Sequence, residues 1–131
     1  MCKSKIHGAV VTEANLHYMG SLTIDRDLLE AANIIPYEWL HVANVTTGGR
    51  FETYAIEGES GSGIIGLNGA AARLGQPGDK LIIMCSAVVS EHELGDFRPR
   101  FVFVDSDNHM MIPAHQTEAE MNAALRTSNG K

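Results

Sequence analysis

Short runs in which apolar and polar residues alternate, separated by turn-forming residues, cover most of the chain. The clearest alternation lies at residues 39–46 and 50–56, and a Thr-Gly-Gly turn signal separates them, so the pair predicts a β-hairpin. Residues 81–89 and 100–105 are apolar enough to be inner strands. Shorter runs predict further strands at residues 5–12, 64–68 and 110–112. Many short strands with closely spaced turns indicate a mainly β fold, a small barrel or a sandwich.

Helical patterns are few and short. Residues 25–33 predict a helix that begins at the N-cap Asp25 and ends at Asn33, a residue that suits a helix exit. The apolar face of this helix consists of Leu28, Leu29 and Ala32. Residues 69–74, which contain three alanines, predict a single helical turn.

A length of 131 residues predicts one domain, residues 1–131. The hydrophobic content of 44% is enough for a globular core, and no run approaches the roughly 18 apolar residues that span a bilayer. The polar tail covers about residues 114–131. We expect a helix within residues 118–126 and disorder over the last few residues.

The net charge of −6 excludes nucleic-acid binding as the leading hypothesis, because such binding needs a basic surface. A small anionic substrate remains compatible with this charge, since a few local cations in a cleft can hold it. The N-terminal residues contain no secretory signal. Cys2 and Cys85 are interpreted as a terminal thiol and a buried thiol rather than a disulfide, so we expect a cytoplasmic protein.

Several common kinds of site are not supported. The six histidines show no metal-ligand spacing and the two cysteines stand 83 positions apart, so no metal site is predicted. The glycine-rich residues 58–63 match neither phosphate-binding pattern, and Ser60 does not complete a nucleophile elbow.

The second strand of the predicted hairpin places Arg50 and Tyr54 on one face by the two-residue period. They are roughly 13 Å apart along a strand. A dicarboxylate could bridge them, with Arg50 gripping a carboxylate through paired hydrogen bonds and Tyr54 passing a proton. The alternative is an exposed Arg50 paired to Glu52 or a neighbour, and a Tyr54 that covers the barrel.

The Gly20-Ser21 bond has a specific chemistry available to it, although chance alone would supply such a dipeptide. A glycine carbonyl can be approached closely and its backbone can adopt strained geometry. The Ser21 hydroxyl could attack this carbonyl and convert the amide to an ester. Elimination from the ester and hydrolysis would then leave a pyruvoyl group at position 21.

Several motifs occur in one order along the chain. They are Lys3-Ser4-Lys5-Ile6-His7, the run from Val11 to Asp25 around Gly20-Ser21, Asn44-Val45-Thr46, Gly49–Tyr54, Asn68–Ala72, and Pro77-Gly78-Asp79 with Ile82-Ile83. Together they resemble the pyruvoyl-dependent aspartate 1-decarboxylases, from about residue 3 to residue 112. The resemblance implies a double-psi β-barrel with short helices and a homotetramer with active sites between subunits. It also implies a lyase made as a zymogen, whose autocatalytic cleavage gives a β chain (residues 1–20) and an α chain (residues 21–131).

The resemblance also implies roles for single residues. Ser21 would become the covalent pyruvoyl cofactor that forms a Schiff base with substrate, and Gly20 would end the β chain. Tyr54 would be the proton donor. The substrate-binding residues would be Lys5, Arg50, Thr53, Asn68, Gly69, Ala70, Ala71 and Ala72. The implied reaction converts L-aspartate to β-alanine and carbon dioxide for pantothenate and coenzyme A synthesis.

One departure from the family pattern is Gly8, because relatives commonly carry an arginine after Lys-Ile-His. We expect this change to slow maturation or alter affinity rather than abolish activity.

Two other hypotheses stay open: a barrel of this fold that is never cleaved and acts as a binding module, and a decarboxylase for another small acid such as glutamate. The sequence does not decide whether cleavage needs a maturation factor.

Overall fold

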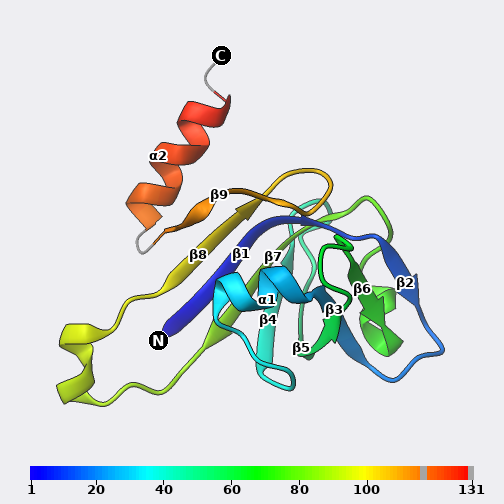
Figure 1. The fold of residues 1–131 in the computed structure, drawn as a ribbon. Coiled ribbons are helices and arrows are strands. Elements are labelled where there is room, and N and C mark those ends of the chain that lie inside the picture. The colour runs from blue at the N-terminus through cyan, green and yellow to red at the C-terminus, as the bar shows by residue number, and fades with distance from the viewer. Residues whose placement is uncertain (116–117, 130–131) are drawn as a thin grey trace.

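The computed structural model describes residues 1–115 and 118–129, and most of its regular structure is strand (Figure 1). The strands are β1 (Cys2–Val10), β2 (Glu13–Asn15), β3 (Ser21–Asp25), β4 (Trp39–Asn44), β5 (Arg50–Gly58), β6 (Ile65–Asn68), β7 (Lys80–Ser86), β8 (Arg100–Val104) and β9 (Met110–His115). The helices are α1 (Arg26–Ala32), α2 (Glu118–Asn129) and the 3₁₀ helices η1 (Gly69–Arg73) and η2 (Glu91–Asp96). The mainly β prediction is confirmed, and the double-psi connection stays a prediction.

The strands form one mixed sheet in the order β2-β6-β3-β5-β4-β7-β1-β8-β9. Leu67 of β6 and Val102 of β8, near opposite ends of this order, are both fully buried in the same hydrophobic cluster. The sheet must therefore curl so that both ends enclose a common core. Asn108 helps to hold this curl, since its carboxamide exchanges hydrogen bonds of 2.7 and 2.8 Å with the backbone of Val10 and donates to the Gly63 carbonyl at 2.7 Å.

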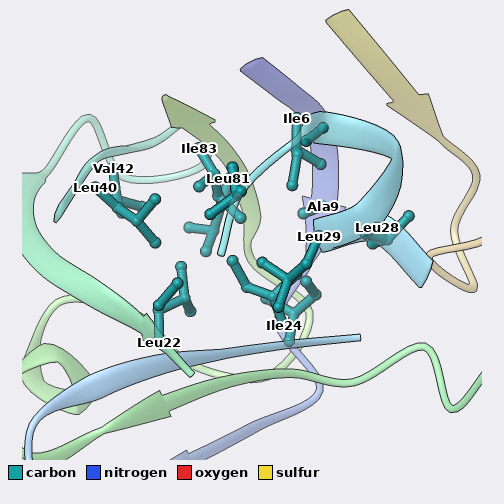
Figure 2. Close-up of a cluster of buried hydrophobic side chains, with 14 of the residues drawn as sticks. Ile6, Ala9, Leu22, Ile24, Leu28, Leu29, Leu40, Val42, Leu81 and Ile83 are labelled. Atoms are coloured by element: carbon teal, nitrogen blue, oxygen red, sulfur yellow. The ribbon is translucent and has the colours of Figure 1, made fainter. Parts of the chain in front are cut away.

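The helix predicted at residues 25–33 is confirmed, and so are the two residues predicted to cap it. Asp25 is the N-cap, accepting from the Asp27 amide, and Asn33 ends the helix in the left-handed conformation with a φ of 58°. Leu28 and Leu29 are both buried, and Figure 2 shows Leu29 pointing toward Ile24 of β3. The helix thus packs on the core with the face that the sequence pattern assigned to it.

The predicted hairpin is also confirmed, because β4 and β5 pair antiparallel with Trp39 opposite Tyr54 and His41 opposite Glu52. The strand predicted at residues 81–89 is shorter than expected. β7 ends at Ser86, which is opposite Cys2 at the start of β1, so the residues after it lie beyond the paired part of β1. The chain then forms η2, which the sequence pattern did not predict; Figure 1 shows it away from the sheet.

The helix expected within residues 118–126 is confirmed by α2, which continues to Asn129. The disorder expected over the last few residues stays a prediction, and residues 130–131 lie outside the described part. Cys85 is buried and Cys2 exposed, and both are free thiols, as the sequence analysis predicted. Burial and the nearby Glu38 carboxylate raise the pKa of the Cys85 thiol to about 11.

A buried carboxylate fixes the end of β3. Asp25 is 1% exposed, and its oxygens accept from the amides of Asp27 at 2.8 Å, Gly61 at 3.1 Å and Gly63 at 2.8 Å. The same side chain therefore caps α1 and orders the glycine-rich loop before β6.

We expect Asp25→Ala to lower the free energy of unfolding by about 2–3 kcal/mol, because three amides lose a charged acceptor. Chemical denaturation would measure this loss. The control is Asp27→Ala, an exposed carboxylate in the first turn of the same helix, for which a loss below about 1 kcal/mol is expected. Equal losses for the two variants would contradict the assigned role of Asp25.

Candidate active site

The site is built around β3, which lies between β5 and β6 in the sheet. β3 runs parallel to β5 with Leu22 opposite Ala55, so the preceding residues Ser21 and Tyr54 are at the same level. It runs antiparallel to β6 with Ser21 opposite Asn68. Ser21 at the start of β3, Asn68 at the end of β6 and Tyr54 in the middle of β5 are thereby brought to one level of three adjacent strands.

The Ser21 hydroxyl is buried and held by a side-chain amide. Ser21 is 2% exposed and Asn68 4% exposed. The Asn68 Nδ2 donates to Ser21 Oγ at 3.0 Å and to Thr23 Oγ1 at 2.8 Å, and Ser21 Oγ lies 3.4 Å from the Met19 carbonyl. Asn68 thus fixes an oxygen at position 21 in a place that solvent barely reaches.

The backbone of Gly69 packs directly on the backbone of Gly20. Gly69 has a φ of 67°, and a Cβ atom there would come within 2.7 Å of the Gly20 nitrogen and Cα and 2.9 Å of the Tyr18 carbonyl. Only glycine permits both this conformation and this approach. The start of η1 therefore supports the Gly20-Ser21 bond from one side.

A hollow of about 320 Å³, here called the Tyr54 hollow, opens beside this bond. It is lined by Gly20, Trp39, Phe51, Glu52, Thr53, Tyr54, Ala70, Ala71 and Leu74. It brings together five of the site residues implied by the sequence motifs, namely Gly20, Thr53, Tyr54, Ala70 and Ala71. Ala72 lies instead on a neighbouring hollow with Arg73 and Gln76.

Arg50 lies next to this hollow rather than in it. The Arg50 hollow, about 280 Å³, is lined by His41, Val42, Arg50, Phe51 and Glu52, and it shares Phe51 and Glu52 with the Tyr54 hollow. Burial alternates along β5, with Thr53 and Ala55 buried and Arg50 and Glu52 exposed, so the predicted common face is confirmed.

The pairing of Arg50 with Glu52, which the sequence left open, is not found. The Glu52 carboxylate instead accepts from Trp39 Nε1 at 2.6 Å and lies 3.5 Å from His41 Nδ1. Within residues 1–115 and 118–129, no carboxylate forms an ion pair with Arg50. The guanidinium therefore keeps its donors available for a ligand carboxylate.

Lys5 lies three strands away from β5, in the middle of β1. The register places Lys5 opposite Met84 of β7, Met84 opposite His41, and His41 opposite Glu52, so all four belong to one row on the outer face. Lys5 does not line the Tyr54 hollow. One chain thus does not bring this cation to Ser21.

The positive charge of Lys5 does influence its own strand. Half-burial, together with the charges of Lys5 and Lys80, lowers the pKa of His7.

Gly8, the departure from the family pattern, stands at a bulge of β1 with a φ of 86°. Its backbone conformation is one that a larger side chain would strain.

Two aromatic residues beside the site were not singled out by the sequence motifs. Trp39 lies opposite Tyr54 and binds Glu52, and the Tyr37 ring centroid lies 6.0 Å from that of Tyr54. Trp39 could have been found from the alternation of the hairpin. Tyr37 carries no such signal, because it lies in a turn whose position depends on tertiary contacts.

No group of three or more potential metal ligands occurs among the described residues. In the same ranges, no helix is long and apolar enough to cross a membrane.

Comparison with known proteins gives one consistent result. The family model described as Aspartate decarboxylase matches residues 1–111. A Clostridium acetobutylicum protein named aspartate 1-decarboxylase is 52% identical over 125 residues, covering 95% of this chain and 96% of its own length. Proteins of the same name from Leptospira biflexa and Pelotomaculum thermopropionicum are 60% identical over 109 residues and 53% identical over 127. These cover 82% and 97% of this chain, and 92% and 96% of their own lengths.

The close backbone approach at Gly69 predicts that Gly69→Ala destabilises the protein beyond the cost of its positive φ. The matched control is Gly78→Ala, since Gly78 has a φ of 95° but nothing within 4 Å of an added Cβ. We expect Gly69→Ala to cost about 1–3 kcal/mol more than Gly78→Ala, because the new methyl must displace backbone. Thermal unfolding measures this difference, and hydrogen exchange should show faster exchange near residues 18–21 in Gly69→Ala alone.

Proposed function

The chain belongs to the aspartate decarboxylase family, and from this premise we propose a self-processing, pyruvoyl-dependent decarboxylase that converts L-aspartate to β-alanine and carbon dioxide. The observation that carries the proposal is the buried Asn68–Ser21 hydrogen bond beside a Gly20 that packs on Gly69. The Gly20-Ser21 peptide bond lies at the edge of the Tyr54 hollow, which Tyr54 lines with its phenol. An ordinary Gly-Ser loop would have neither feature.

The proposed maturation step uses these residues directly. The Ser21 hydroxyl attacks the Gly20 carbonyl carbon, the peptide C–N bond breaks, and an ester joins the two residues. Elimination then releases the Gly20 carboxylate and leaves dehydroalanine at position 21, which takes up water and loses ammonia to give the pyruvoyl group. Asn68 holds the Ser21 oxygen, and the Gly69 backbone limits the movement of Gly20.

The residues around position 21 fit a pyruvoyl group. Asn68 Nδ2 is a buried donor that already binds the oxygen on this side chain, and the absence of a Cβ at Gly69 lets its backbone lie against that of Gly20. The group supplies an electron sink for the pair released with carbon dioxide, as pyridoxal phosphate does elsewhere.

We assign substrate binding and proton transfer to β5. Arg50 has no ion pair in the described part of the chain and can bind the side-chain carboxylate of aspartate through two parallel hydrogen bonds. Tyr54 lines the hollow beside Gly20 and can return a proton to the substrate carbon. Thr53, Gly69, Ala70, Ala71 and Ala72 would surround the bound substrate.

The position of Lys5 supports a site shared between subunits. Lys5 is three strands from β5 within one chain, so its proposed contact with a substrate carboxylate requires a second copy. We therefore propose that Lys5 of one subunit faces the Tyr54 hollow of another, within the homotetramer that the family resemblance implies. The α and β chains would each stay in their subunit, because β1 remains paired with β7 and β8 after cleavage.

The proposed setting is the cytoplasm, and the free thiols of Cys2 and Cys85 support it. The product would feed pantothenate and coenzyme A synthesis, which the family resemblance implies. A maturation factor enters the proposal only if the purified chain fails to cleave by itself.

The proposal predicts that intact-mass measurement of the purified protein finds fragments of residues 1–20 and 21–131, and that the longer fragment contains a borohydride-reducible carbonyl. Ser21→Ala should stay at full length, fold, and lack decarboxylase activity. The matched control is Ser62→Ala, which changes the exposed serine of the other Gly-Ser pair and should cleave as the unaltered protein does. Decarboxylation by Ser21→Ala would refute the assigned cofactor, and full-length protein that persists both after purification and in cell lysate would support the binding-module alternative.

Arg50→Lys should lower kcat/KM for L-aspartate by about 10–100-fold, because lysine keeps the charge but loses the paired hydrogen bonds. Cleavage should be unaffected, since Arg50 lies outside the Tyr54 hollow. Arg26→Lys, on the exposed face of α1, is the control and should leave both measurements unchanged. Rates on L-aspartate and L-glutamate, compared in the unaltered protein, test the substrate. A higher kcat/KM for glutamate would favour the alternative decarboxylase.

A further inference from the structure

Tyr37 has a backbone conformation that is uncommon for its residue type. It lies in the turn of residues 35–38, and its φ is 76°. A proline at the second position followed by a positive φ at the third is the pattern of a type II turn, where the third residue is usually glycine or asparagine. A tyrosine here is strained, so the surrounding structure must hold it in place.

Hydrogen bonds attach this turn to β5 next to Tyr54. The Tyr37 amide donates to the Ala55 carbonyl at 2.7 Å, and the Ala55 amide donates to the Glu38 carbonyl at 3.0 Å. The Glu38 carboxylate accepts from the Ile35 amide at 3.0 Å and from Lys3 Nζ at 2.5 Å. The hydrogen bonds from Lys3 and Ile35 outweigh partial burial and lower the pKa of Glu38. The turn is therefore anchored at both ends, while the Tyr37 side chain is exposed.

The Tyr37 ring makes its contact with Tyr54. The ring centroids are 6.0 Å apart with an interplanar angle of 33°, a distance at which aromatic pairs attract. Tyr37 is 77% exposed, so burial in the core does not explain it. Among the described residues its hydroxyl has no hydrogen-bond partner, so the contact depends on the ring alone.

We propose that Tyr37 is a positioning residue for Tyr54, whose ring it holds at the rim of the Tyr54 hollow. The inference rests on the proposed role of Tyr54 as proton donor. A phenol that must reach a substrate carbon has to keep one orientation, and the Tyr37 ring on the turn is the aromatic group in contact with it. A glycine or asparagine at position 37 would suit this φ but would not supply the ring.

The first test reads the Tyr54 ring without using activity. The chain has three tyrosines, so labelling with 3-fluorotyrosine gives three ¹⁹F resonances that single Tyr→Phe variants assign. Tyr37→Gly should remove one resonance and shift that of Tyr54, while Tyr18 keeps its own. Asn33→Gly is the matched control, because it relaxes another positive φ on the same connection without touching Tyr54. An unmoved Tyr54 resonance in Tyr37→Gly overturns the inference.

The second test measures kinetics per cleaved chain, with the cleaved fraction determined by intact mass. Tyr37→Gly should lower kcat about tenfold with little change in KM, and Tyr37→Phe should retain kcat because it keeps the ring. Glycine suits a φ of 76°, so the melting temperature of Tyr37→Gly should not fall. Unchanged kcat in Tyr37→Gly, or equal losses in Tyr37→Gly and Tyr37→Phe, would overturn the proposal.

A double variant separates this inference from the proposed function. In a Tyr54→Phe background, Tyr37→Gly should lower kcat by much less than tenfold, because the group it positions is gone. The same tenfold loss in that background would show that Tyr37 acts without Tyr54. If Tyr54→Phe alone keeps full kcat, the proton-donor role itself fails. If Tyr54→Phe is inactive while Tyr37→Gly is normal, only the positioning role fails.

Discussion

The position of β3 between a parallel and an antiparallel neighbour is the constraint on which the rest of the site depends. This strand has five residues, and polar side chains fix both of its ends. At one end the Asn68 carboxamide binds Ser21 and Thr23, and at the other the Asp25 carboxylate binds three amides of α1 and the loop before β6. Because the strand cannot shift in register, the Gly20-Ser21 bond stays against Gly69 and at the level of Tyr54.

Charge is distributed unevenly around this fixed strand. The protein carries a net charge of −6, yet Arg50 has no ion pair in the described residues, because Trp39 and His41 are the partners of the nearby Glu52. A carboxylate paired with Arg50 would compete with any anionic ligand for the guanidinium. The Trp39–Glu52 hydrogen bond directs this carboxylate to a partner other than Arg50, although Glu52 lines both hollows.

Strain and support coincide at the turn before β4. Tyr37 is held at positive φ by backbone bonds to Ala55 and by a Glu38 carboxylate that Lys3 and Ile35 anchor. Strained residues persist where the structure around them over-determines their conformation, and they gather at functional sites. The turn follows this rule, since the strand that anchors it also carries Tyr54. The strained backbone of Tyr37 costs some stability, and its ring lies against that of Tyr54 beside the Tyr54 hollow.

The sequence by itself determined the local elements and the residues that end them. Asp25 and Asn33 act as caps through their own side chain and backbone, and the two-residue period put Arg50 and Tyr54 on one face, so both follow from neighbouring residues. The motifs also identified the family. Tertiary structure alone decided which partners meet: Asn68 with Ser21, Glu52 with Trp39, and Tyr37 with Tyr54. It also placed Lys5 three strands away. These outcomes depend on strand order and register, which are set by how one sheet curls around its core, and no local pattern encodes that.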